Sequence, residues 1–546
     1  MKTLIHGALV YDGTGEAPRA ADVLIDGERI AAVEAGLAGR DIDAERVDAR
    51  GRMVTPGFLD MHRHCDVAPL RDADFGTLEL AQGITATTVG NCGIACVPVP
   101  PDRYADYRAF AVPVVGDMPP EFAFFDYRAY FAALEAAKPA LHMGVMAATG
   151  AVRVAVKGFA DTPYTQAEMA RAQAHVAEAM ACGALGVSLG FMYLPEFYTT
   201  PEEEVRVIAP AARAGGVLTT HVRGEGDSLA ASIREVLDIA RRAGIRLHIS
   251  HLKATGIRNW NRGIHEAIAL LEDARAHGEP VTADFYPYAG GSTTVFSLIP
   301  PTVTRQSNEG TLRYLATAAG RRALREGIAR EHAGWDNMAL SIGWDRILVA
   351  GTRLPEHAGY AGRSVLALAQ AAGYGEPSDF ICDLVVAEGG QVTVIVLSMD
   401  ERDVDTVARL PYAALISDAL YGGGGNPHPR LYGAFPRLIR DFVLARSILP
   451  METAVRKMTG LPASILGLTE RGLIRPGYRA DVAVFDPAAL LDHATYEDSR
   501  RLSTGMERLL MDGRTVWTNS HATDRHAGQV LRRENGDLGE QARAVL

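Results

Sequence analysis

The stretch Phe58-Leu59-Asp60-Met61-His62-Arg63-His64 is a short apolar run that ends in two histidines one residue apart. Side chains alternate between the two faces of a β-strand, so a strand through this stretch would project His62 and His64 from the same face. If the strand ends at His64, both imidazoles lie at its C-terminal end and aim at one point. In a loop, the same His-x-His pair would be two ordinary polar residues. Other residues of the chain are needed to distinguish the two interpretations.

Seven more short β-like runs follow this stretch, separated by helix-like segments. This alternation is typical of βα units, and eight strands indicate an α/β fold of the (β/α)₈ barrel type. The gap between the seventh and eighth runs is far too long for a loop. We therefore expect residues 290–405 to form an inserted subdomain, or lid, between strands 7 and 8. The predicted strands are 58–64, 85–92, 142–149, 184–189, 217–221, 246–251, 281–286 and 414–418.

The two ends of the chain have a different pattern, in which apolar and polar residues alternate around tight turns. Asp26-Gly27 and Asp512-Gly513 are pairs that favour β-hairpin turns. We predict that residues 1–56 and 472–546 together form one small β-sandwich domain. Residues 57–471 then form the barrel.

Composition excludes several classes of function. The 546 residues carry a net charge of −11, which argues against a nucleic-acid-binding surface. No uninterrupted apolar run of about 18 residues is present, so no membrane span is expected. The five cysteines are odd in number and too sparse for a disulfide framework, which favours a reducing compartment and leaves thiols free to act as ligands. We expect a cytoplasmic protein, and the sequence leaves a homo-oligomer open.

Polar residues that can bind a metal ion stand at the C-terminal ends of five predicted strands. Active sites of (β/α)₈ enzymes lie at this end of the barrel. Imidazole, thiolate and carboxylate ligands suit zinc, and a catalytic zinc keeps one position open for water. Each residue alone has an ordinary interpretation as a core histidine, a small buried thiol or a turn aspartate, but together they predict a metal site. They are His62, His64, Cys92, His221, His251 and Asp418.

Longer motifs surround these residues and extend over nearly the whole chain. They include Gly90-Asn91-Cys92-Gly93, Thr220-His221-Val222-Arg223, Ile249-Ser250-His251-Leu252-Lys253, Tyr286-Pro287-Tyr288-Ala289-Gly290-Gly291-Ser292-Thr293, Ser417-Asp418 and His428-Pro429-Arg430-Leu431-Tyr432-Gly433. On these motifs the chain resembles the amidohydrolase superfamily, and within it the N-acyl-D-amino-acid deacylases, or D-aminoacylases.

The resemblance implies a role for each of the predicted site residues. It implies that Cys92, His221 and His251 hold one tightly bound zinc ion, and that His62 and His64 offer a second, weaker metal site. It also implies that Asp418 is the catalytic carboxylate. The α-carboxylate of the substrate would be bound by Lys253, Tyr286 and Arg430, with Ser292 close by.

The chemistry of these residue types agrees with the implied reaction. Zinc lowers the pKa of a bound water to about 7 and polarises the scissile carbonyl. A carboxylate such as Asp418 can take the proton from that water and deliver it to the departing amine. Arg430 offers a bidentate fork to a carboxylate, and Lys253 is one of only five lysines in the chain. We therefore expect zinc-dependent hydrolysis of small-molecule N-acyl-D-amino acids, with the D configuration resting on the resemblance alone.

Two alternatives remain at this point. One is a cyclic-amide hydrolase of the hydantoinase or dihydroorotase kind, in which a carboxylated lysine bridges two metal ions, and Lys157 is the residue to test for that role. The other is a non-catalytic barrel that acts as a scaffold or binding subunit.

Overall fold

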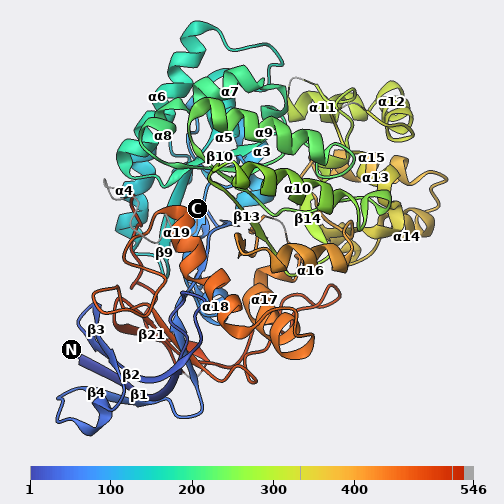
Figure 1. Cartoon of the computed structure of the whole chain (residues 1–546). Coiled ribbons are helices and arrows are strands. Elements are labelled where there is room, and N and C mark those ends of the chain that lie inside the picture. The colour runs from blue at the N-terminus through green and yellow to red at the C-terminus, as the bar shows by residue number, and fades with distance from the viewer. Residues whose placement is uncertain (1, 306, 333, 423, 519, 534–546) are drawn as a thin grey trace.

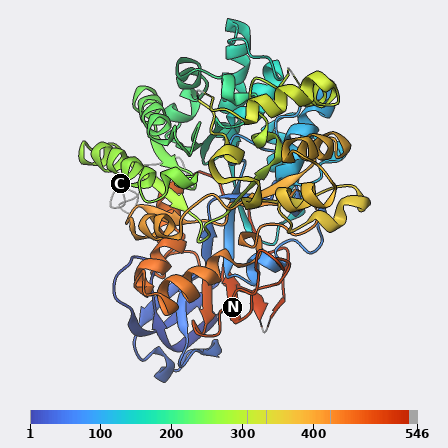
Figure 2. The same cartoon turned by 90° about the vertical axis from the view of Figure 1, so that its right-hand side faces the viewer.

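The computed structural model describes residues 2–533 except 306, 333, 423 and 519. The last part of the predicted C-terminal domain segment, 534–546, lies outside the described residues. At one end of the molecule, strands from the two termini lie side by side (Figure 1). The helices of the 290–405 segment project from the side of the central body (Figures 1 and 2).

The central body is an eight-stranded parallel barrel in which every strand follows its predecessor in space. Its order is β17-β13-β12-β11-β10-β9-β8-β6. Parallel strands covered on both faces are continuously apolar or buried, and β8 and β11 are buried at every position. The strands are β6 (Phe58–Asp60), β8 (Ile84–Val89), β9 (His142–Ala148), β10 (Gly186–Gly190), β11 (Val217–His221), β12 (Arg246–Ile249), β13 (Val281–Phe285) and β17 (Ala413–Leu415).

Helices surround the barrel and complete its βα units. Helix α6 begins with a capping box in which the Thr165 hydroxyl and the Glu168 carboxylate each bond the other residue's backbone N–H. The helices are α1 (Ala68–Arg71), α2 (Thr77–Leu80), α3 (Tyr104–Val115), α4 (Tyr127–Ala137), α5 (Thr149–Lys157), α6 (Gln166–Cys182), α7 (Pro201–Val207), α8 (Ala209–Arg213), α9 (Leu229–Ala243), α10 (Gly263–Ala276), α16 (Glu401–Arg409), α17 (Arg430–Arg437), α18 (Met451–Met458) and α19 (Gly460–Leu466).

The first and last strands close the barrel only at its C-terminal end. The Asp418 amide donates to the His62 carbonyl at 2.9 Å. Just beyond it, β18 (Ala419–Leu420) pairs in parallel with β7 (Arg63–His64). The expected single strand over 58–64 is therefore wrong in detail, because Met61 and His62 interrupt it between β6 and β7.

The terminal strands form one nine-stranded sheet. Its path is β22-β21-β20-β19-β5-β1-β2-β3, and β4 pairs with β1. Strand β5 from the N-terminal part pairs antiparallel with β19 from the C-terminal part, so residues more than 400 positions apart share one sheet. The strands are β1 (Lys2–Val10), β2 (Arg19–Asp26), β3 (Arg29–Glu34), β4 (Glu45–Asp48), β5 (Met53–Pro56), β19 (Val482–Phe485), β20 (Met506–Met511), β21 (Arg514–Thr518) and β22 (His521–Ala522).

A buried ion-pair network joins this sheet to the N-terminal end of the barrel. Arg471 Nη1 lies 3.0 Å from Nε2 of His142, the first residue of β9. The same guanidinium pairs with Asp481, and its Nη2 lies 3.1 Å from Asp512 Oδ1. The histidine and the two carboxylates could hold a cation by their spacing alone, but the arginine already supplies the positive charge at their centre.

The segment between β13 and β17 contains its own sheet and its own apolar cluster. Strands β14 (Gly291–Thr294), β15 (Ile347–Gly351) and β16 (Thr393–Val396) pair in the antiparallel order β14-β16-β15. The buried cluster runs from Val295 to Val396 and is separate from the barrel core. The helices are α11 (Asn308–Leu315), α12 (Ala318–Ile328), α13 (Met338–Ile342), α14 (Val365–Ala371) and α15 (Pro377–Ala387).

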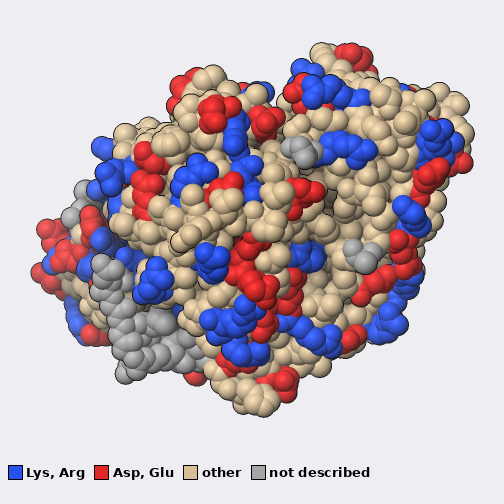
Figure 3. Space-filling view, turned by 90° about the horizontal axis from the view of Figure 1, so that it is seen from above, with Lys and Arg blue, Asp and Glu red and all other residues tan. Residues whose placement is uncertain are grey.

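Acidic and basic side chains are interspersed over the face of the molecule seen in Figure 3. Among the helices of the described residues, none is both long enough and apolar enough to cross a lipid bilayer.

Candidate metal and active site

Three predicted site residues leave their strands in a left-handed backbone conformation that residues other than glycine rarely adopt. They are Cys92 (φ 52°), His251 (φ 37°) and Asp418 (φ 51°). The turn to Cys92 starts at Gly90, where φ is +80° and a Cβ would lie 2.4 Å from the Met146 carbonyl oxygen. Backbone strain of this kind concentrates at functional sites, and here it lies at the barrel mouth.

The first group of possible metal donors is Cys92, His221 and His251, whose ligand atoms all lie within 4.8 Å of one another. Cys92 Sγ is 3.5 Å from His251 Nε2. Tetrahedral zinc with bonds of roughly 2.0–2.3 Å separates its ligand atoms by about 3.5 Å. The Nδ1 atom of His221 is buried and has no hydrogen-bond partner among the described residues. The donor set and its spacing therefore fit a zinc ion.

A second group shares the same thiol. His62, His64, Cys92 and Asp418 also place their donor atoms within 4.8 Å of one another. His62 Nε2 lies 3.2 Å from Cys92 Sγ, and Asp418 Oδ1 lies 3.4 Å from Nε2 of both histidines. Cys92 thus stands between two donor groups, where a thiolate could serve two ions.

The charges of the site favour an ionised thiolate and an ionised carboxylate. Burial raises the pKa of the Cys92 thiol, but the facing His62 and hydrogen bonds from His221 and His251 hold that pKa well below its usual value. Burial likewise raises the pKa of Asp418, and Arg430 and His62 outweigh it, so that the pKa lies well below the usual range. Both groups are in the forms that bind metal ions and accept protons.

The chain is similar to known proteins over nearly its whole length. A family model described as the amidohydrolase family matches residues 45–362 and 403–517. A D-aminoacylase from Alcaligenes xylosoxydans xylosoxydans is 32% identical over 537 residues, which cover 97% of each protein. The chain belongs to the amidohydrolase family.

Two solved structures of similar amidohydrolases carry metal centres. One is a D-aminoacylase studied for its binuclear metal centre, with 32% identity and a TM-score of 0.80. The other is N-acyl-D-glutamate deacylase from Bordetella bronchiseptica, complexed with zinc and a phosphonate inhibitor, with 30% identity and a TM-score of 0.81. Each match covers 97% of this chain and 99% of the other.

In this amidohydrolase the predicted substrate-binding residues gather on one side of the metal donors. The Tyr286 ring lies under two cations, 5.7 Å from Lys253 Nζ and 4.6 Å from the Arg430 guanidinium carbon. The Tyr286 hydroxyl is buried and has no partner among the described residues. Arg430 Nη1 lies 2.8 Å from Asp418 Oδ2 but is not aligned for a hydrogen bond, and its Nε also has no partner among those residues. Ser292 lines the pocket that contains the metal donors.

Two buried carboxylates beside the metal donors were not predicted from the sequence. Glu225 Oε1 lies 3.0 Å from His251 Nδ1 and 2.5 Å from Lys253 Nζ. Asp284 accepts from the His251 backbone N–H, and its Oδ2 lies 3.7 Å from His62 Nδ1. A metal-binding histidine commonly donates its second ring N–H to a carboxylate, which fixes the tautomer and the ring orientation. Glu225 follows His221 by four residues between two glycines, and Asp284 is a charged residue inside a buried strand; both features were available as signals.

Lys157, the candidate for a carboxylated lysine, lies outside the pocket that contains the metal donors. Lys157 ends α5, and its Nζ donates to the Thr162 hydroxyl at 3.0 Å and the Pro163 carbonyl at 2.8 Å. The expectation that Lys157 could bridge two metal ions is therefore wrong for this fold, because its amine is held by a surface loop.

Proposed function

We propose that this amidohydrolase cleaves the amide bond of N-acyl-D-amino acids and releases a carboxylate and a D-amino acid. The observation that carries the proposal is a thiol shared by two groups of buried histidines, beside a carboxylate and a pocket lined by Lys253 and Tyr286. The side of the site where Lys253 and Arg430 lie against Tyr286 suits the α-carboxylate of an amino acid. The D configuration is supported by the two solved relatives, a D-aminoacylase and an N-acyl-D-glutamate deacylase.

Each predicted residue has a part in this reaction. Cys92, His221 and His251 would hold the tightly bound zinc, and His62 with His64 a weaker second ion. Zinc, when bound, supplies a Lewis acid that polarises the scissile carbonyl and makes water acidic enough to react at neutral pH.

Side chains of the protein carry out proton transfer and substrate binding. Asp418 takes the proton of the attacking water and passes it to the amine nitrogen, which leaves poorly unless it is protonated. Lys253, Tyr286, Ser292 and Arg430 would bind the substrate carboxylate. The unused N–H groups of Arg430 and the free Tyr286 hydroxyl support this assignment, because buried polar groups normally have a partner.

We also propose the domain division behind this site. Residues 1–56 and 472–546, of which 534–546 lie outside the described residues, are assigned to the small β-sandwich domain and 57–471 to the catalytic barrel, with 290–405 as an insertion or lid. The separate apolar cluster between Val295 and Val396 supports the insertion.

A release assay tests the function. Zinc-loaded protein should free D-amino acids from N-acetyl-D-amino acids but not L-amino acids from the L-enantiomers, and a chelator should abolish the release until zinc is restored. Hydrolysis of hydantoin or dihydroorotate with no release from N-acetyl-D-amino acids would favour the cyclic-amide alternative. No hydrolysis of any amide would favour the non-catalytic barrel.

A further inference from the structure

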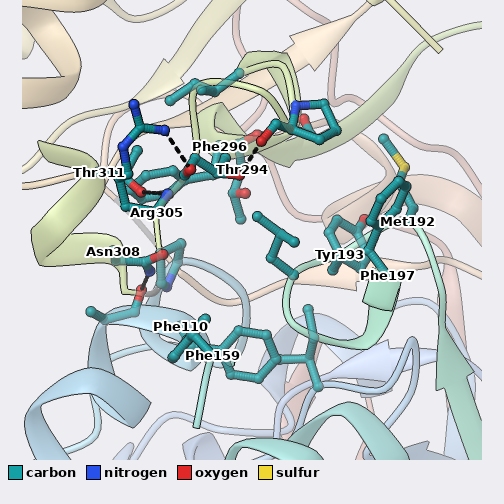
Figure 4. A pocket seen from close by; sticks show the side chains of 18 of the residues that line it. Phe110, Phe159, Met192, Tyr193, Phe197, Thr294, Phe296, Arg305, Asn308 and Thr311 are labelled. Carbon is teal, nitrogen blue, oxygen red and sulfur yellow. Dashed lines mark hydrogen bonds between the residues drawn. The ribbon is translucent and has the colours of Figure 1, made fainter. Parts of the chain in front are cut away.

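A second cavity adjoins the pocket that contains the metal donors and has no part in the reaction described so far. It measures about 770 Å³ including its open mouth. Its walls are rich in aromatic side chains that face a common space (Figure 4). They include Phe110, Phe159, Tyr193, Phe197, Phe296 and Trp335.

This apolar chamber adjoins the pocket that contains the metal donors, whose volume is about 610 Å³ including its open mouth. Ile94, Met192 and Tyr193 line both. The Met192 sulfur lies 3.1 Å from His221 Nε2, and the Tyr193 ring centroid lies 5.0 Å from that of His221. Met192 and Tyr193 thus contact a predicted metal ligand from the border that the two spaces share, and the apolar chamber begins beside the predicted metal site.

Several polar side chains of the apolar chamber already have hydrogen-bond partners in the protein. Asn308 Nδ2 donates to the Ala109 carbonyl at 3.3 Å, and the Thr311 hydroxyl donates to the Ser307 carbonyl at 3.0 Å. The exposed Arg305 donates to backbone carbonyls at 2.9 Å and lies over the Tyr314 ring. An occupant therefore meets mainly hydrocarbon, which favours an apolar group.

The two ends of the substrate can be assigned by the positions of the charges. Of the residues proposed to bind the α-carboxylate, Lys253, Tyr286 and Ser292 line the pocket that contains the metal donors, and none lines the apolar chamber. In an N-acyl-amino acid the acyl group lies across the scissile bond from the carbon that bears both the carboxylate and the side chain. With the carboxylate bound at Tyr286, the acyl group points away from the cations and toward Met192 and Tyr193.

We propose that the apolar chamber binds the acyl group, and that the enzyme prefers N-acyl-D-amino acids with a long aliphatic or aryl acyl chain. This inference rests on the proposed function and adds its substrate class. It also gives the 290–405 segment a role, because Phe296 and Thr311 from this segment face Phe110 of α3 and Phe159 across the chamber (Figure 4).

The test is a matched pair of substrate series with the zinc-loaded full-length protein. One series varies the acyl group of D-alanine from acetyl through butyryl and hexanoyl to octanoyl and phenylacetyl. The other keeps acetyl and varies the D-amino acid side chain. Because a buried methylene contributes roughly 0.8 kcal/mol, kcat/KM should rise about fourfold for each early methylene of the acyl series. A flat or falling acyl series with cleavage of the acetyl substrate would overturn the inference and leave the proposed function intact.

Variants that fill the chamber test whether the preference for long acyl chains arises there. Ala109 lines the chamber on α3, whereas Ala105 is exposed on the same helix. Ala109→Phe, or the smaller Ala109→Leu, should lower the ratio of octanoyl to acetyl kcat/KM at least tenfold, and Ala105→Phe should leave this ratio unchanged. The ratio is used because partial misfolding lowers both rates together. A loss confined to the side-chain series would overturn the inference, and no cleavage of any substrate would overturn it together with the proposed function.

Discussion

Glu225→Gln tests the carboxylate that the structure places behind the predicted zinc ligands. Burial raises the pKa of Glu225, but Lys253 and the imidazoles of His221 and His251 outweigh it and lower that pKa. The carboxylate is therefore ionised at neutral pH and can hold His251 through Nδ1, at 3.0 Å. Glutamine keeps the shape of the side chain and removes the charge.

Glu225→Gln is expected to lower both the zinc affinity and the stability of the metal-free protein. Removal of a carboxylate that orients a metal-binding histidine lowers metal affinity roughly 10–100-fold, equivalent to about 1.4–2.7 kcal/mol. The metal-free protein also loses stability, because Lys253 is left as a buried ammonium whose partner at 2.5 Å is gone. Breaking a buried pair in this way costs roughly 3–5 kcal/mol, and the remaining amide oxygen should keep the cost near the lower end.

Competition with a chromophoric chelator measures the zinc affinity, and urea unfolding of the metal-free protein measures the stability. Glu235→Gln is the matched control, since Glu235 pairs with Arg223 and does not line the pocket that contains the metal donors. It should change zinc affinity less than twofold. If Glu225→Gln binds zinc as tightly as the wild type, the carboxylate does not orient His251 and the reasoning fails.

Three further predictions follow from other parts of the molecule. Asp418→Asn should lower kcat for an N-acyl-D-amino acid roughly 10²–10⁴-fold while the tightly bound zinc is retained, because the proton carrier is lost; an unchanged kcat would exclude that role. Lys457 is buried, and burial with nearby Arg456 lowers its pKa to about 7, so the unfolded chain binds a proton that the folded protein lacks between about pH 7 and 10. The wild type should therefore lose about 1.4 kcal/mol of stability per pH unit as pH falls through this window, and Lys457→Met should not. Urea unfolding midpoints of both proteins at pH 7, 8 and 9 measure this difference. The same pH dependence in both proteins would contradict the assignment. Arg471→Met should destabilise the protein by roughly 3–5 kcal/mol, because two buried carboxylates lose their cation, whereas the exposed Arg475→Met should stay within about 0.5 kcal/mol in the same unfolding assay.

The barrel could be predicted because its strands are short buried runs with helical segments between them. Strand 217–221 agrees with β11 at both ends, and the predicted barrel of eight parallel strands is confirmed. The errors lie at the strand ends. Cys92 and His251 were placed on their strands, but β8 ends at Val89 and β12 at Ile249. Residues other than glycine with positive φ give no signal in the sequence for such turns.

The site was predicted to the extent that residue type reveals chemistry. Cysteine, histidine and aspartate after successive strands indicate metal binding, and the structure brings all six together. Glu225 and Asp284 were missed, although the glycines beside Glu225 and the charge of Asp284 inside an apolar strand were signals for both. The apolar chamber was beyond the sequence, since Phe110 and Phe296 meet across it only after the inserted segment packs against α3.

The central claim is that a cysteine thiolate holds the zinc together with histidines. Zinc K-edge X-ray absorption of protein loaded with one equivalent of zinc measures this directly. The account predicts one sulfur neighbour at about 2.3 Å with nitrogen or oxygen neighbours at about 2.0–2.1 Å, and loss of the sulfur in Cys92→Ser. A wild-type spectrum with nitrogen and oxygen neighbours alone, or a sulfur neighbour that persists in Cys92→Ser, would contradict it.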